Sequence, residues 1–166
     1  MEKYDWGRFV TRIDVKAAEE TLYNAWATRA GMESWFLRLC EYKKKDGSLR
    51  EGNEYVITGD TYKWLWHGWP DDTVEHGEIL DCNRKDFFRF SFGKAGNCAV
   101  SIKKEEGTNI VELVQDNIPT DEGGMHNWHL GCKTDWTFYL ANLKSILEGG
   151  LDLRNKNEKL QQVINS

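Results

Sequence analysis

The feature that most constrains the fold is a change of pattern near the end of the chain. Over residues 42–116, apolar and polar residues alternate in short stretches separated by turn signals, a pattern that predicts successive antiparallel strands. Over residues 125–148, apolar residues instead recur at helical spacing, and Gly149 follows, which predicts a long helix that ends at this glycine. A sheet with one apolar face must be covered. The terminal helix is the element with enough apolar length to cover it.

The beginning of the chain adds one strand and two short helices. Residues 8–15 alternate as a half-buried strand, residues 17–27 have helical spacing, and Thr28 is placed to cap a second short helix that runs towards Trp35. The strands expected later are 54–58, 63–69, 74–81, 86–92, 98–105 and 108–116. The predicted fold class is α+β: an antiparallel β-sheet wrapped around a long C-terminal α-helix, with two short helices after the first strand.

Length and charge limit the organisation and the partners. A chain of 166 residues suits one domain, which we expect at residues 1–154, followed by a polar tail at 155–166 that has some helical potential. The net charge of -5 argues against nucleic acid as a partner. The first seven residues hold no apolar run, and no stretch is apolar enough for a membrane span. We therefore expect a cytoplasmic protein, either a monomer or a homodimer.

Histidines and cysteines are candidates for catalysis or metal binding, but their spacing supports neither. His126, His129 and Cys132 lie three residues apart and could share a metal, yet the pattern lacks the usual zinc-binding spacing, so we interpret them as polar residues near a helix start. His67 and His76 lie on neighbouring predicted strands, and we interpret them as surface residues. The four cysteines form no CxxC pair and are expected as free, mostly buried thiols. We predict no cofactor, no metal site and no catalytic residue.

The aromatic content, 8 Trp, 6 Tyr and 7 Phe, is high for a chain of this length. Large amphipathic rings line cores, and they also line ligand cavities. Composition alone does not separate these two interpretations. The residues that alternate on strands, or share a helix face, are the candidates for a cavity wall: Trp35, Trp64, Trp66, Phe88, Phe90, Phe92, Trp128, Trp136 and Tyr139.

Three stretches carry a family resemblance that extends from about Gly7 to Arg154. They comprise residues 13–17, 22–28 and 35–36, then residues 77–80 and 86–92, and finally the most specific, WTFYLANLKSILEGGLDLR at 136–154. With these stretches the chain resembles the START-like (SRPBCC, Bet v 1-like or helix-grip) superfamily, and within it the activator-of-Hsp90-ATPase-like group. Two stretches depart from the usual pattern, the Trp-rich residues 62–69 and residues 125–132.

The resemblance implies strands that grip the C-terminal helix around an apolar cavity, but it does not imply one function. Members include binders of lipids, sterols and other apolar ligands, polyketide cyclases, and a domain that stimulates a chaperone ATPase. Our leading hypothesis is a non-enzymatic domain that binds a small apolar or aromatic molecule between sheet and helix. One alternative is an interaction protein whose surface binds a chaperone or another protein, and another is a cyclase- or hydrolase-type enzyme.

Overall fold

The computed structural model describes residues 1–164 and has the predicted α+β architecture. The elements in chain order are β1 (Phe9–Val15), α1 (Glu19–Ala27), α2 (Arg29–Trp35), β2 (Leu39–Lys43), β3 (Thr61–Leu65), β4 (Val74–Cys82), β5 (Phe87–Ser91), η1 (Gly93–Ala95), β6 (Asn97–Glu105), β7 (Thr108–Asp116), η2 (Gly124–Leu130) and α3 (Gly131–Leu147). Within this described part, no helix combines the length and the apolar character that crossing a bilayer requires.

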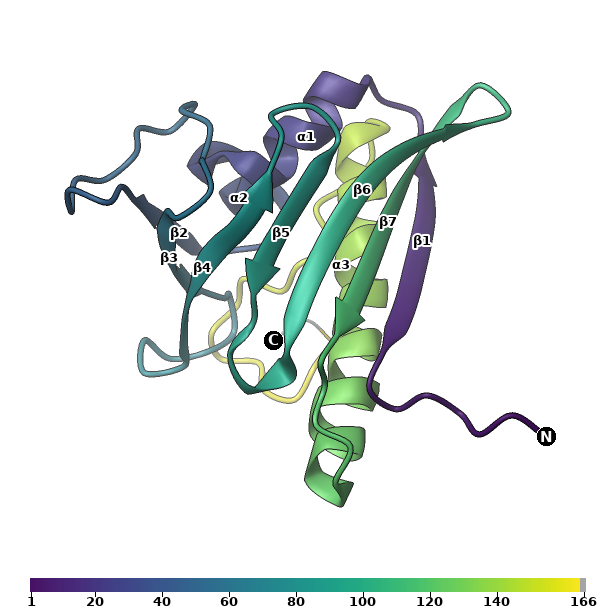
Figure 1. The fold of residues 1–166 in the computed structure, drawn as a ribbon. Helices are drawn as coiled ribbons and strands as arrows, with labels where there is room; N and C mark the ends of the chain where they lie inside the picture. Colours follow the sequence, from purple (N-terminus) through teal and green to yellow (C-terminus); the bar gives the residue numbers. More distant parts are fainter. Residues whose placement is uncertain (165–166) are drawn as a thin grey trace.

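The strands form one antiparallel sheet of seven, in the order β1-β7-β6-β5-β4-β3-β2. Strands β2 to β7 therefore follow one another as an antiparallel meander, in which β2 was not among the predicted strands, and β1 closes the row beside β7. Figure 1 shows α3 crossing one face of the curved sheet, with α1 and α2 on the same side. This arrangement confirms the helix-grip fold class.

Aromatic rings pack closely in the core between the sheet and α3. Trp136 of α3 stacks on Phe36, with ring centroids 5.0 Å apart, and Phe36 meets Trp64 of β3 edge to face at 5.7 Å. Gln115 is buried at the centre of this layer, where its side-chain oxygen accepts a hydrogen bond of 2.9 Å from the Trp136 indole. The amide nitrogen of Gln115 donates to the Ala95 carbonyl, so the buried polar side chain is satisfied at both ends.

The strand predicted at residues 54–58 is wrong. This segment lies in the β2–β3 connection, where its backbone is engaged outside the sheet. The Val56 N–H donates to the Ala27 carbonyl at the end of α1, and the Ile57 N–H donates to the carboxylate of Asp60. Asp60 also pairs with the buried guanidinium of Arg50. A local ion pair and a contact with α1 therefore replace the sheet hydrogen bonds that a strand at this place would make.

Several other boundaries differ from the predicted ones, and two differ by more than two residues. The strand expected at 63–69 ends at Leu65, since the next carbonyl, that of Trp66, accepts a hydrogen bond from Arg38, and Gly68 adopts a left-handed φ of 81° within the loop. The predicted terminal helix begins as the π-helical η2, and the α-helix proper starts at Gly131, whose N–H bonds five residues back to the carbonyl of His126.

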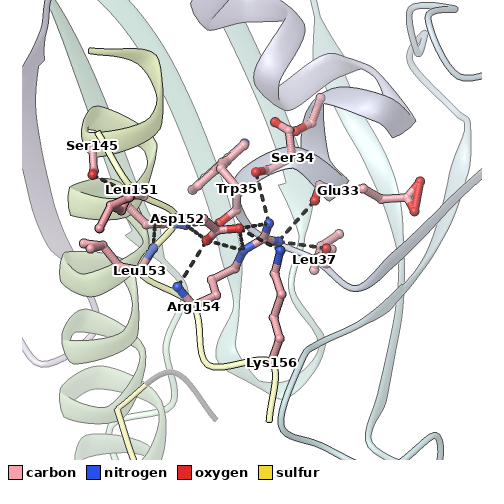
Figure 2. A network of polar contacts seen from close by, with 12 residues as sticks. Glu33, Ser34, Trp35, Leu37, Ser145, Leu151, Asp152, Leu153, Arg154 and Lys156 are labelled. Carbon is pink, nitrogen blue, oxygen red and sulfur yellow. Dashed lines mark hydrogen bonds and ion pairs between the residues drawn. The ribbon is translucent and has the colours of Figure 1, made fainter. Parts of the chain in front are cut away.

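The last part of the family-like motif is anchored by buried polar contacts. Figure 2 shows Arg154 pointing at the end of α2, where it donates to the carbonyls of Glu33, Ser34 and Leu37. These carbonyls lie at the C-terminus of a helix, where backbone acceptors lack partners within the helix and attract a cation. Asp152 accepts from Arg154 at 2.8 Å. The motif therefore fixes the chain after α3 onto α2.

The contacts around Asp152 alter its ionisation. Partial burial acts to raise the pKa of this carboxyl, but hydrogen bonds from Arg154 and Lys156 outweigh burial and hold the pKa well below its usual value. Buried Asn142 of α3 joins the same cluster, because it donates to the Trp35 carbonyl and accepts from the Leu153 N–H. Beyond this cluster, residues 155–164 run as an irregular tail with a turn closed by the Leu160 N–H and the Asn157 carbonyl.

Candidate ligand-binding cavity

A cavity of about 950 Å³ lies between α3 and the part of the sheet next to the β3–β4 loop. One wall is the face of α3 that carries Cys132, Asp135 and Tyr139, which are spaced three and four residues apart. The facing walls come from the β3–β4 loop, from Glu75 of β4 and from η1, while the tail contributes Ile164. The helix therefore has two faces with different roles, since the neighbouring stripe through Trp136 packs into the core.

The predicted cavity residues divide into two groups. Trp66, Phe92, Trp128 and Tyr139 line the cavity. The remaining five lie in the closely packed core, each with no more than 2% of its surface exposed, and they are Trp35, Trp64, Phe88, Phe90 and Trp136. Strand alternation found residues that face the helix layer, but it did not distinguish those that fill the layer from those that border a space.

Several lining residues were not among the candidates. Trp69 and Phe138 add two more rings to the wall, and Glu75 and Asp135 add two carboxylates. The sequence contains a signal for Asp135, because its spacing of four residues from Tyr139 places both on one helix face. Glu75 lies beside His76, which we interpret from the sequence as a surface residue, and no sequence pattern places Glu75 next to Gly93. The two sequence stretches that depart from the family pattern supply three of the tryptophans, Trp66, Trp69 and Trp128.

The two carboxylates meet an environment that disfavours their charge. Burial raises the pKa of Glu75 and likewise that of Asp135. Glu75 is half-buried, whereas Asp135 is exposed to solvent at the cavity. Burial also raises the pKa of the Cys132 thiol to about 11, and the charges of Asp135 and Glu75 add to that rise. The thiol is therefore protonated at neutral pH and is a poor nucleophile.

The carboxylate of Glu75 lies close to the backbone of Gly93 in η1. A Cβ atom built on Gly93 would come within 2.5 Å of Oε1 of Glu75, so the carboxylate lies directly against the backbone of η1. Gly93 also has a φ of 52°, which side-chain-bearing residues rarely adopt. The absence of a side chain at this position lets Glu75 lie at the cavity wall.

A second hollow, also about 950 Å³, lies between the β3–β4 loop and the tail. Polar and charged side chains dominate its lining, among them Arg38, Asp71 and Glu158. Arg38 and Asp71 form an ion pair of 2.8 Å there. An apolar molecule is accommodated better by the first cavity, whose wall is largely aromatic.

The histidines lie outside the cavity, and His129 has a structural role. Its ring is buried, with Nδ1 2.9 Å from the Trp6 carbonyl and Nε2 2.9 Å from the Tyr4 hydroxyl. A carbonyl only accepts, so Nδ1 carries the proton of this contact. Both nitrogens are engaged in holding the N-terminal segment against η2. Over residues 1–164, no group of three or more metal-ligating side chains comes together.

Comparison with known proteins supports the fold over nearly its whole length. The family model described as "Activator of Hsp90 ATPase homolog 1-like protein" matches residues 16–148. No curated protein gives a significant sequence match.

Solved structures with the same fold include proteins from bacteria and from a parasite. A Staphylococcus saprophyticus protein is 19% identical, with a TM-score of 0.68 and coverage of 89% of this chain and 96% of its own. The Aha1 dimer from Colwellia psychrerythraea is 18% identical, with a TM-score of 0.64 and coverage of 86% and 97%. An Hsp90 activator from Plasmodium falciparum is 18% identical, with a TM-score of 0.57 and coverage of 85% and 96%. At these identities the likeness extends to the fold alone.

Proposed function

The chain belongs to the activator of Hsp90 ATPase homolog 1-like family, and from that premise and the cavity beside α3 we propose that it is a non-enzymatic domain that binds a small apolar or aromatic molecule. The observation that carries the proposal is the cavity itself, about 950 Å³ and lined by six aromatic side chains: Trp66, Trp69, Phe92, Trp128, Phe138 and Tyr139. Ligand pockets usually measure about 300–1,000 Å³ and are mostly apolar with a few polar groups.

The aromatic rings of the neighbouring core pack closely, in contrast to the rings that line the cavity. Rings such as Trp64, Phe90 and Trp136 pack at centroid distances of 5.1 to 6.3 Å, close to the spacing of contacting aromatic pairs. The same chain therefore packs aromatics tightly in the core and leaves a space bordered by aromatics next to it. A protein without a ligand gains stability by filling such a space, so its presence favours a binding role.

A fluorescent apolar probe tests the proposal on the full chain. We expect saturable binding with a dissociation constant in the micromolar range and a rise in melting temperature, because a ligand that prefers the native state stabilises it by mass action. Trp66→Ala should weaken the probe about tenfold by removing one wall, an effect within the range of a large aromatic contact.

Tyr55→Ala is the matched control. Tyr55 is also a partly buried aromatic packed against the core, but it contacts Tyr23 and lies outside the cavity. Its loss should lower stability and leave probe affinity unchanged. If both variants change probe affinity equally, or if the native protein fails to bind any apolar probe, the proposed function is wrong.

A catalytic role is the second candidate, and one observation favours it. Glu75 and Asp135 are carboxyls with raised pKa inside an apolar cavity, and groups of this kind often act as general acids or bases. Incubation of the bound molecule with the protein, followed by mass spectrometry, separates the two roles. An unchanged mass after many hours supports binding alone, whereas turnover abolished by Glu75→Gln establishes an enzyme.

A protein partner is the third candidate, since two structural neighbours are titled as Aha1 or as an Hsp90 activator. In that case the outer surface would carry the function, and substitutions in the cavity would leave partner binding intact. We propose a cytoplasmic location for either role, as a monomer or homodimer. Free thiols at Cys40, Cys82, Cys98 and Cys132 fit a reducing compartment.

A further inference from the structure

The charged side chains that line the cavity narrow the chemical class of its ligand. The charged residues of its lining are two carboxylates, Glu75 and Asp135, and one cation, Lys94. The two side chains come from opposite walls, β4 and α3. Both add their charge to the same neighbour, the buried thiol of Cys132. The negative groups therefore converge on one region of the cavity.

The protein leaves these carboxylates without partners. Over residues 1–164, no side chain or backbone group donates a hydrogen bond to either carboxylate, and neither forms an ion pair. Lys94 of η1 also borders the cavity, but it is exposed and lies beyond ion-pair distance of both. Some other acids of this chain do have partners, such as Glu54 with Arg50 and Asp152 with Arg154.

The aromatic walls favour the same kind of ligand. Trp66, Trp69 and Trp128 line the space, and the face of a tryptophan ring attracts a cation through its quadrupole. An ammonium group donates hydrogen bonds that the carboxylates lack, while an apolar body occupies the space between the rings. An anionic ligand such as a fatty acid would instead place a third negative charge beside two others.

We propose that the ligand is an apolar or aromatic molecule that carries one protonated amine. Its ammonium group lies against Glu75 and Asp135, and its apolar body lies against Trp66, Trp69 and Trp128. This inference rests on the proposed function and adds the charge and donor chemistry of the ligand to it.

The test compares three probes with the same ring system and different charge. These are 1-naphthylmethylamine, the neutral 1-naphthalenemethanol and the anionic 1-naphthoate, titrated calorimetrically into the full chain at pH 7.5. We expect the amine to bind about tenfold tighter than the alcohol, and the carboxylate to bind most weakly. The double variant Glu75→Gln/Asp135→Asn should reduce the preference for the amine to about twofold or less and leave the alcohol's affinity unchanged.

Glu78→Gln is the control for net charge. Glu78 lies on the same strand, three residues after Glu75, and is exposed to solvent outside the cavity. It should keep the full preference for the amine. A melting temperature no lower than that of the native protein shows that the double variant is folded, as expected when two uncompensated charges are removed.

The outcomes distinguish the inference of an amine ligand from the proposed function of binding an apolar molecule. If the alcohol and the amine bind equally well, or if Glu78→Gln lowers the preference as much as the double variant does, the amine inference is overturned and the apolar binding function stands. If none of the three probes binds the folded protein, both are overturned.

Discussion

Arg154→Ala should cause a large loss of stability, because this side chain connects the end of the chain to α2. The guanidinium donates to the carbonyls of Glu33, Ser34 and Leu37 at 3.0 to 3.1 Å, and to Asp152 at 2.8 Å. Only 3% of the side chain is exposed. Alanine removes all of these donors without offering a replacement, since the site is closed to solvent.

The expected loss follows from what the substitution leaves behind. Removing one partner of a buried ion pair typically costs about 3–5 kcal/mol, mainly through the group left unpaired. Here Asp152 is 27% exposed and keeps contacts with Lys156 and Asn142, which places the estimate at the lower end, about 3 kcal/mol. For a domain of this size, the melting temperature should then fall by about 6–12 °C.

Urea denaturation measures this loss as a lower midpoint with an unchanged slope. Arg154→Lys should recover only part of it, because one ammonium lacks the planar fork that reaches the α2 carbonyls and Asp152 together. Arg12→Ala is the control: Arg12 pairs with Glu105 and Glu112 on the surface and is 43% exposed, so its loss should cost about 1 kcal/mol or less.

The pH dependence gives a second test of the same contact. The pKa of Asp152 is lowered in the folded protein, so its stabilisation is present above the usual carboxyl pKa and is lost as pH falls through the lowered value. The difference in unfolding free energy between the native protein and Arg154→Ala should therefore shrink in strong acid. If Arg154→Ala is no more destabilising than Arg12→Ala at neutral pH, the anchoring role of Arg154 is refuted.

Three further predictions concern the core, the cavity and the N-terminal segment. Trp136→Ala should lower the free energy of unfolding by about 3–5 kcal/mol, since the ring is buried and its indole donates to Gln115; a thermal melt equal to that of the native protein would contradict this. Glu75→Gln should stabilise the unliganded protein at pH 8 but not at pH 4, because burial raises the pKa of Glu75 in the folded state and its ionisation costs stability as pH rises above the usual value; parallel stability curves of the two proteins against pH would refute it. His129→Ala should increase hydrogen exchange in residues 4–8 with little change elsewhere, because Tyr4 and Trp6 lose their partner; unchanged exchange there would show that other contacts hold the segment.

The fold was predictable from the sequence wherever a periodicity was long enough to be unambiguous. The nine-residue strands β6 and β7 and the apolar stripe of α3 were found in this way. The hairpin between these strands was marked by Glu106 and Gly107, both of which adopt the positive φ that such a turn requires. The prediction failed at residues 54–58, where a short apolar stretch looks like a strand but Asp60, held by Arg50, accepts a hydrogen bond from the Ile57 N–H.

The cavity was less predictable for a physical reason. Alternation tells which face of a strand meets the helix layer, but the boundary between packed layer and empty space depends on how loops and helix ends approach one another. Trp64 and Trp66 illustrate this, because they have the same parity in sequence, yet one is buried on β3 and the other borders the cavity at the start of a loop. No pattern in the chain predicts that Gly93 leaves room for the carboxylate of Glu75.

The carboxylates at the cavity differ in their contacts from the buried polar side chains Gln115, Asn142 and Arg154. In the core, the polar atoms of Gln115 and Asn142 have partners, and buried Arg154 is fully engaged. At the cavity, half-buried Glu75 loses water without gaining a partner, which costs stability in the unliganded protein. A neutral or apolar residue at position 75 would remove that cost. Such a conflict with local stability is expected where a protein keeps a group for function. A ligand with a hydrogen-bond donor and a positive charge would supply both the partner and the opposite charge that Glu75 lacks.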